Sequence, residues 1–125
     1  MESTEVPMIS IIDDDRAVRE ATKGLVRSLG YNASAFASAE EFLGSERLND
    51  TSCLITDLQM PGLSGIELQD RLIAGGHRMP IIFITAYPEE SIRVRAMKAG
   101  AVCFMSKPYS DASLVGCIEK ALAFA

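Results

Sequence analysis

Short apolar runs alternate along the chain with longer stretches in which apolar residues recur at helical spacing. Most of the short runs are apolar at consecutive positions, which is typical of parallel strands buried on both faces of a sheet. They predict five strands, at residues 8–12, 31–36, 53–56, 81–85 and 101–105. The run at 31–36 is the least apolar and predicts an edge strand, whereas the run at 81–85 is the most apolar and predicts the central strand.

After the first strand, apolar residues recur at i, i+3, i+4, i+7, i+8 and i+11, which predicts a helix with one core-facing side. That side consists of Val18, Ala21, Thr22, Leu25, Val26 and Leu29. Gly30 follows it and is suited to end the helix in a left-handed conformation.

The other four helices are predicted from their first residues and their periodicity. Ser38 and Ser64 each stand three residues before a glutamate, which is the capping-box pattern, and we expect the helix after Ser38 to run to about residue 48. Pro88 suits the first turn of a fourth helix, and a fifth is expected over residues 111–123. The residues expected to face the core are Leu68, Leu72 and Ile73 in the third helix and Leu114, Val115, Ile118 and Leu122 in the fifth.

Five strands that alternate with five helices predict a doubly wound α/β domain, most simply one parallel sheet with helices on both faces. At 125 residues, the chain is expected to form a single domain.

Charge and hydropathy narrow the classes of function. The net charge of −5 makes binding to nucleic acid by this domain alone implausible, because phosphate neutralisation needs clustered lysine and arginine. No apolar run approaches the roughly 20 residues that span a membrane. The acidic N-terminus lacks the basic and apolar segments of a secretory signal. We therefore expect a cytoplasmic protein without membrane contact.

The cysteines and the histidine do not form a pattern typical of metal sites. Cys53, Cys103 and Cys117 lie in apolar surroundings, which indicates reduced core thiols. His77 is the only histidine and stands in a Gly-Gly-His-Arg segment, which is typical of a solvated loop. A zinc site is therefore not expected.

Polar residues stand at the carboxyl ends of four predicted strands. They are Asp13 and Asp14 after the first strand, Asp57 after the third, Thr85 at the end of the fourth and Lys107 after the fifth. In an open parallel sheet, ligands bind beyond these strand ends. Because all five strands point the same way, we expect these side chains to converge.

The acidic residues of this set have an ordinary interpretation and a functional one. Asp13, Asp14 and Asp15 could serve only to cap the following helix and to place favourable charge in its first turn. Three adjacent carboxylates repel one another, however, and Asp57 increases the repulsion unless a cation neutralises it. Hard oxygen ligands suit Mg²⁺, with Mn²⁺ as an alternative.

Asp57, Thr85 and Lys107 could each be structural, as a strand-end cap, a β-branched strand residue and a surface lysine. Taken together with the acidic pair, they favour another interpretation. A carboxylate can attack phosphorus once a metal ion and an ammonium group withdraw charge from the phosphoryl oxygens. We therefore interpret Asp57 as a phosphoryl acceptor.

Other chemistries of α/β proteins fit less well. A Walker loop and a Gly-x-Gly-x-x-Gly fingerprint are both absent from the sequence. Asp13 and Asp15 have the Asp-x-Asp spacing of haloacid-dehalogenase-type phosphatases. The best candidate for a nucleophile, however, is the single aspartate after the third strand, Asp57, and no cap domain is evident. Two alternatives stay open: a hydrolase of small phosphate esters, and an interaction module of the same fold that works without phosphate.

Four motifs occur in a fixed order along the chain: Ile12-Asp13-Asp14, the segment from Asp57 to Gly65, Thr85-Ala86 and Lys107-Pro108. This order resembles the receiver domain of bacterial two-component response regulators, over about residues 8–123. The segment 96–101 resembles the subgroup that controls transcription through a C-terminal helix-turn-helix domain. The resemblance implies a flavodoxin-like (βα)5 fold with the strand order 2-1-3-4-5.

The resemblance also implies a role for each residue of the site. Asp57 would accept a phosphoryl group, and Thr85 and Lys107 would bind its oxygens. Phe104 stands where the family carries its aromatic switch residue, so Thr85 and Phe104 would form the switch. The peptide bond between Lys107 and Pro108 would be cis. The Mg²⁺ ligands would be Asp13, Asp14, Asp57 and the backbone carbonyl of Gln59.

Three positions are less standard for the family. Phe104 replaces the commoner tyrosine. Gln59 and Tyr87 each lie two residues after a site residue, at the positions that in this family flank the attacking water when the acyl phosphate is hydrolysed. We hypothesise that the bulky Tyr87 shields the phosphoryl group and slows its loss.

The partners implied by the resemblance are a sensor histidine kinase or a phosphotransfer protein. Whether phosphorylation drives formation of a homodimer through the fourth helix and fifth strand stays open. The domain would be no conventional enzyme, although it would catalyse its own phosphotransfer and a slow autodephosphorylation. We expect one receiver domain over residues 1–125 and no output domain in this chain.

Overall fold

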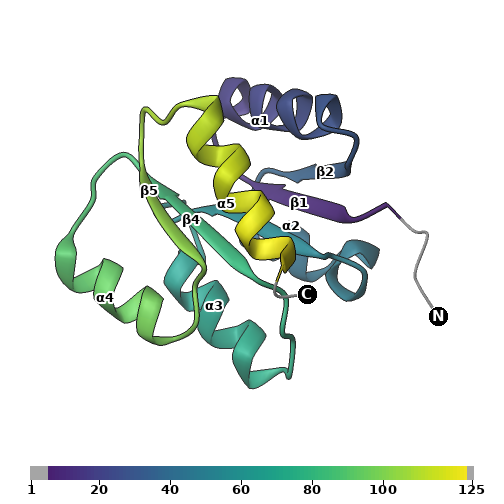
Figure 1. Cartoon of the computed structure of the whole chain (residues 1–125). Helices are drawn as coiled ribbons and strands as arrows, with labels where there is room; N and C mark the ends of the chain where they lie inside the picture. Colours follow the sequence, from purple (N-terminus) through teal and green to yellow (C-terminus); the bar gives the residue numbers. More distant parts are fainter. Residues whose placement is uncertain (1–5, 124–125) are drawn as a thin grey trace.

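The computed structural model describes residues 6–123 and contains one sheet of five parallel strands (Figure 1). The strands are β1 (Met8–Ile12), β2 (Asn32–Phe36), β3 (Cys53–Asp57), β4 (Ile81–Thr85) and β5 (Cys103–Ser106). The helices are α1 (Arg16–Ser28), α2 (Ala39–Leu43), α3 (Gly65–Ala74), α4 (Glu90–Lys98) and α5 (Asp111–Ala123), with a 3₁₀ turn η1 (Glu46–Asn49) after α2.

The strand order is β2-β1-β3-β4-β5, and all neighbouring strands are parallel. The predicted doubly wound α/β fold with the order 2-1-3-4-5 is therefore confirmed. The weakly apolar β2 is an edge strand, as predicted. The prediction that residues 81–85 form the central strand is wrong, because β3 is the middle strand and β4 lies next to it. Both strands are buried along their whole length, so their apolar patterns do not distinguish them.

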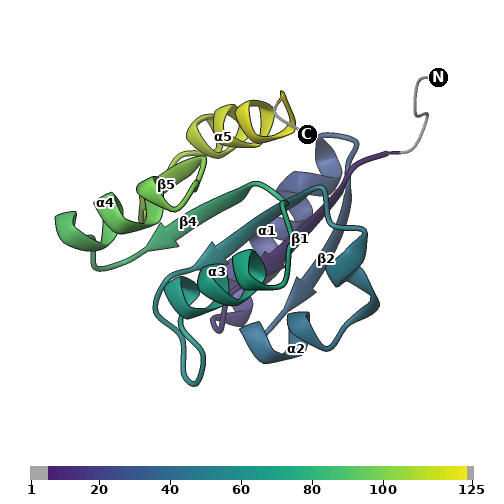
Figure 2. The ribbon, with the colours of Figure 1, turned by 90° about the horizontal axis from the view of Figure 1, so that it is seen from below.

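Helices cover both faces of the sheet (Figures 1 and 2). One core layer lies between the sheet and α1 and α5, and it includes Val26, Leu114 and Ile118. The other lies between the sheet and α2, α3 and α4, and it includes Phe42 and Leu72. Successive side chains of a strand point to opposite faces, so each consecutive apolar run supplies both layers at once.

Two helix starts follow the local chemistry that the sequence indicates. Ser64 and Glu67 form a complete capping box at the start of α3. Ser38 accepts a hydrogen bond from the Glu41 N–H at the start of α2, which is one half of the predicted capping box.

Three helix predictions need correction. The helix after Ser38 does not continue to residue 48, because α2 ends at Leu43 and the chain passes through Gly44 into the 3₁₀ turn. Pro88 lies outside α4, which begins at Glu90 after the N-cap residue Glu89. Two residues of the predicted core side of the first helix are exposed: Ala21, and Leu29, which is 38% exposed and lies just beyond the last residue of α1.

The core side of α3 also differs from the prediction. Leu68 and Leu72 are buried, but Ile73 is 52% exposed and Gln69 is buried instead. The Gln69 amide donates a hydrogen bond to the Ala96 carbonyl of α4 at 3.1 Å. Residues 69 and 73 lie one turn apart on the same side of α3. Gln69 on that side contacts α4, whereas Ile73 is exposed to solvent.

Candidate functional site

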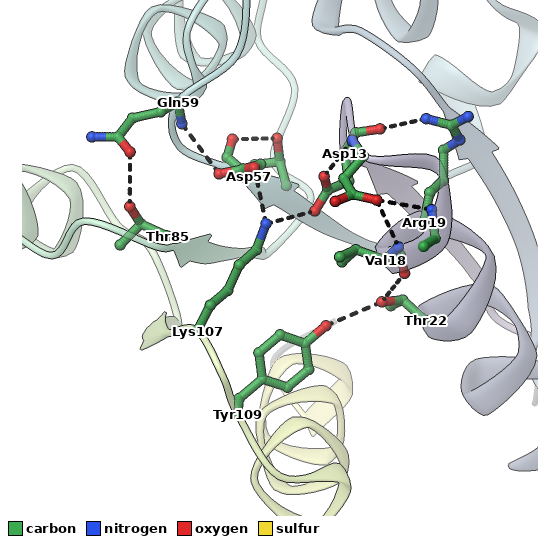
Figure 3. Close-up of polar contacts among 12 residues, drawn as sticks. Asp13, Val18, Arg19, Thr22, Asp57, Gln59, Thr85, Lys107 and Tyr109 are labelled. Carbon is green, nitrogen blue, oxygen red and sulfur yellow. Dashed lines mark hydrogen bonds and ion pairs between the residues drawn. The ribbon is translucent and has the colours of Figure 1, made fainter.

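The site lies at the carboxyl ends of β1, β3 and β5, where one ammonium group stands between two carboxylates (Figure 3). Lys107 Nζ lies 3.1 Å from Asp13 Oδ2 and 3.1 Å from Asp57 Oδ2. Asp13 is 3% exposed and Asp57 is 6% exposed, so both charges are nearly withdrawn from water. The convergence expected from the strand ends is present for these three residues.

Strand register places the two carboxylates side by side. Ile12, the last residue of β1, pairs with Thr56 of β3, so Asp13 directly after β1 lies beside Asp57 at the end of β3. Lys107 follows the end of β5, and its backbone N–H donates to the Thr85 carbonyl. Two strands separate β1 from β5, so the long lysine side chain is needed to reach across the sheet.

Hydrogen bonds hold the carboxylates in place. Asp13 Oδ1 accepts from the Asp15 N–H at 2.9 Å, and the Asp13 carbonyl accepts from Arg19 Nη1 at 2.7 Å. Asp57 Oδ1 accepts from the Gln59 N–H at 3.2 Å. The orientation of both acids is therefore set by the loops that follow β1 and β3.

Burial and ion pairing shift the proton affinities of this cluster. Burial is the largest influence on Asp13 and raises the pKa of its carboxyl, although the Asp15 N–H and the Lys107 ammonium act to lower it. Burial alone would lower the pKa of Lys107, but its bonds to Asp13 and Asp57 outweigh that influence and raise it. Lys107 is therefore a cation at neutral pH.

The carboxylates can together hold a divalent cation. Asp13, Asp14 and Asp57 each offer one oxygen, and these three atoms lie within 4.8 Å of one another. Asp13 and Asp57 are buried and Asp14 is exposed, which gives the cluster an open side. Three carboxylates face a single lysine, so the local charge is negative. This donor set fits Mg²⁺, which binds one or two carboxylates and keeps several waters.

Thr85 is buried but makes no hydrogen bond to Asp57 among the described residues. Its hydroxyl donates to Gln59 Oε1 at 3.4 Å and accepts from the Tyr87 N–H at 3.1 Å (Figure 3). The side chain of Tyr87 is 70% exposed. Thr85 therefore lies at the rim of the site and is engaged by its own loop and by Gln59.

Phe104 and Pro108 complete the predicted set. The Phe104 ring is half-buried on the α4 side of the sheet, 6.4 Å from the Phe83 ring centre. The peptide bond between Lys107 and Pro108 is cis.

Two residues outside the predicted set shape the loop after Asp57. The Glu40 carboxylate accepts from the Leu63 N–H at 3.1 Å and so ties this loop to α2. Gly65 lies so close to β3 that an added Cβ would stand 2.7 Å from the Asp57 carbonyl oxygen. Sequence reasoning missed both, because Glu40 has the pattern of an ordinary acidic residue in the first turn of a helix and Gly65 that of an ordinary turn residue.

Arg19 was also missed, although it contacts the Asp13 carbonyl. Its position gives no signal, because it belongs to the polar side of α1.

The three thiols converge although they are distant in sequence. Burial, the largest cause, and the neighbouring thiols raise the pKa values of Cys53 and Cys117 to about 12. All three cysteines are unpaired by disulfides. The predicted reduced thiols are therefore present.

None of the helices within residues 6–123 has the length and apolar character needed to cross a bilayer.

Comparison with known proteins gives one consistent family. A family model described as "Response regulator receiver domain" matches residues 9–119. The response regulator protein TodT of Pseudomonas putida is 42% identical over 123 residues, which are 98% of this chain and 54% of TodT. The transcriptional regulatory protein FixJ of Azorhizobium caulinodans is 39% identical over 91% of this chain and 54% of FixJ. The chain thus spans about half the length of the curated relatives it matches.

Solved structures agree with this result. The structure titled FixJ-N has a TM-score of 0.86 at 34% identity, with 98% of both chains covered. The response regulator StyR has a TM-score of 0.89 at 42% identity and covers 96% of this chain and 61% of its own.

Proposed function

The chain belongs to the response regulator receiver domain family, and from this membership we propose that it is a phosphorylation-activated switch with Asp57 as the phosphoryl acceptor. The observation that carries the proposal is the placement of the buried Asp57 carboxylate 3.1 Å from the Lys107 ammonium and beside the Asp13 and Asp14 carboxylates. Family membership, strand-end position and charge all support the same residue.

The chemical step is an in-line displacement. A carboxylate oxygen of Asp57 forms a bond to phosphorus, and the bond from phosphorus to the donor breaks, at the imidazole nitrogen of a phosphohistidine or at the acyl oxygen of acetyl phosphate. The electron pair of the broken bond leaves with the donor. Lys107 then exchanges one carboxylate contact for a phosphoryl oxygen, which its ammonium neutralises.

Receiver domains generally bind Mg²⁺ at an acidic pocket, and the donor set of this chain fits that ion. In our proposal, Asp13, Asp14 and Asp57 hold Mg²⁺ together with the Gln59 backbone carbonyl, and Mn²⁺ can replace it. The bound ion supplies charge neutralisation at the phosphoryl oxygens.

The switch in this proposal passes through Thr85 and Phe104. Phosphorylation offers the Thr85 hydroxyl a charged acceptor in place of Gln59 Oε1, which it contacts at 3.4 Å. Movement of Thr85 leaves room beside the half-buried Phe104 ring, which turns inward. The surface of α4, β5 and α5 then changes its preference for a partner, an output domain or a second copy of the chain. The phosphodonor is a sensor histidine kinase or a phosphotransfer protein.

The test is intact mass after incubation with Mg²⁺ and acetyl phosphate. We expect one added phosphoryl group in the wild type and none in Asp57→Asn or after chelation of the metal. Asp50→Asn is the matched control, because Asp50 is an exposed aspartate paired with Arg47. Failure of the wild type to gain mass, under conditions that preserve acyl phosphates, would favour an interaction module that works without phosphate. Steady-state turnover of small phosphate esters would favour a hydrolase.

The same phosphorylated sample tests two finer parts of the proposal. Earlier elution on size exclusion supports a dimer through α4 and β5, and identical elution with and without phosphate contradicts it. A shorter lifetime of phospho-Asp57 in Tyr87→Ala supports shielding by Tyr87, and an unchanged lifetime removes that role.

A further inference from the structure

A second polar contact lies beside the site and has no part in the proposed function. The Tyr109 hydroxyl and the Thr22 hydroxyl are 3.1 Å apart (Figure 3). Tyr109 belongs to the segment between β5 and α5, and Thr22 lies in the middle of α1. Thr22 is 4% exposed, so this contact joins two elements distant in sequence at a nearly buried point.

The direction of this hydrogen bond follows from the neighbouring bond. The Thr22 hydroxyl has one hydrogen, and it donates that hydrogen to the Val18 carbonyl at 2.8 Å. Thr22 must therefore accept, and the Tyr109 phenol donates. A phenylalanine at position 109 would lose the donor and keep the ring.

The segment that carries Tyr109 has few backbone hydrogen bonds, although the Ser110 hydroxyl accepts from the Ser113 N–H at the start of α5. Lys107 makes the last backbone bond of β5, and the next backbone acceptor is the Ser110 carbonyl, which receives the Leu114 N–H at the start of α5. In the part of the chain that the structure describes, the Tyr109 and Ser110 N–H groups donate to no backbone carbonyl. Pro108 has no N–H to donate.

Side-chain packing leaves an opening at the same place. A mostly apolar groove of about 440 Å³ separates α1 from the segment, and it is lined by both Lys107 and Tyr109 together with residues such as Val18 and Leu25. Tyr109 also packs against the core layer on this side of the sheet, but within the described residues its bond to Thr22 is the only hydrogen bond between the segment and α1.

We propose that Tyr109 is a positioning residue for phosphoryl transfer: its bond to Thr22 anchors the segment so that the Lys107 ammonium stays between Asp13 and Asp57. This inference rests on the proposed function. Only Pro108, with its fixed φ, separates the two side chains along the backbone, so displacement of Tyr109 displaces the base of Lys107. Lys107 must reach both carboxylates at 3.1 Å, and a shift of its base weakens that reach.

The experiment measures the rate of phosphorylation by acetyl phosphate at saturating Mg²⁺. We expect Tyr109→Phe and Thr22→Val each to slow the reaction about five-fold, which corresponds to one ordinary hydrogen bond of about 1 kcal/mol. The double variant should be no slower than either single one, because both remove the same bond. Thr22→Ser keeps the acceptor and should stay close to the wild type.

Controls separate positioning from a general loss of structure. In a Lys107→Ala background, Tyr109→Phe should have no further effect on the rate, because the group that it positions is gone. Tyr31→Phe is the matched control, since Tyr31 is a half-buried tyrosine whose hydroxyl makes no hydrogen bond within the described residues.

Each outcome has one meaning. An unchanged rate in Tyr109→Phe and Thr22→Val, or an equal slowing with and without Lys107, overturns the positioning role. If the wild type takes up no phosphoryl group at all, the proposed function fails, and that result is distinct because it appears before any variant is compared.

Discussion

Two buried carboxylates share one ammonium group at the rim of the sheet, and this arrangement is a poor one for stability. Asp13 is 3% exposed and lies near the carboxylates of Asp14 and Asp57. Burial raises the pKa of Asp13, which means that the fold favours the protonated acid. The stability that this group contributes is therefore present at low pH and is lost as the pH rises through its folded pKa. In the proposed function, the charged form of Asp13 serves the binding of Mg²⁺ rather than folding.

We accordingly expect Asp13→Asn to raise the melting temperature of the metal-free protein by a few degrees at neutral pH, because the variant removes one of three neighbouring negative charges. Added Mg²⁺ should stabilise the wild type and have little effect on the variant. Thermal denaturation with Mg²⁺ or with chelator measures both effects. Asp50→Asn is the control, and a variant less stable than the wild type without metal would contradict the expectation.

At the scale of elements, the position of Asp57 depends on how closely α3 approaches β3. Gly65 is the first residue of α3, and its N–H donates to the Leu58 carbonyl at 2.8 Å. An added Cβ would stand 2.7 Å from the Asp57 carbonyl oxygen and 3.1 Å from the Phe83 ring. These neighbours are backbone and a buried ring, so neither can move aside easily. The helix can lie this close to the strand only with glycine at this position.

Gly65→Ala is expected to lower the free energy of unfolding by about 1–3 kcal/mol, the usual cost of overpacking. It should also slow the phosphorylation of Asp57, because the end of β3 must shift. Gly116→Ala is the matched control within α5, where no atom lies within 4 Å of an added Cβ. That substitution should raise stability by about 0.5–1 kcal/mol. Urea denaturation measures both, and equal effects at the two positions would argue against close approach at Gly65.

At the scale of the whole molecule, the layer between the sheet and α1 and α5 contains thiols that resist ionisation. Burial raises the pKa of Cys53 from 9.0 to about 12. When the folded pKa lies above the unfolded one, the stability is complete below the unfolded value and is lost as the pH rises toward the folded value. The relevant window is therefore from about pH 9 to about pH 12.

Within that window, the free energy of unfolding should fall faster with pH in the wild type than in Cys53→Ala. The difference in slope should approach about 1.4 kcal/mol per pH unit, the value for one proton. Urea denaturation at several pH values from neutral upward measures it. Equal slopes for the two proteins would show that Cys53 does not ionise on unfolding.

Much of the molecule was determined by local sequence patterns. Short apolar runs predicted the five strands, and β2 was correctly placed at an edge because it is the least apolar. The strand-end residues Asp13, Asp57 and Lys107 could be named as one site before any coordinates, because parallel strands direct their carboxyl ends to the same edge. The full strand order came from the family resemblance and not from the pattern of residues.

What only the tertiary structure decided depends on packing between segments that are distant in sequence. The burial of Gln69 in place of Ile73 follows from where α4 lies against α3, and helical periodicity carries no information on a neighbour. The middle strand is β3 and not β4. The sequence could not distinguish them, because both strands are buried on two faces and have similar apolar patterns. The tie between Tyr109 and Thr22 joins residues 87 positions apart. The periodicity of apolar residues shows which side of a helix or strand is buried. Which other helix or strand packs against that side is decided only when the whole chain folds.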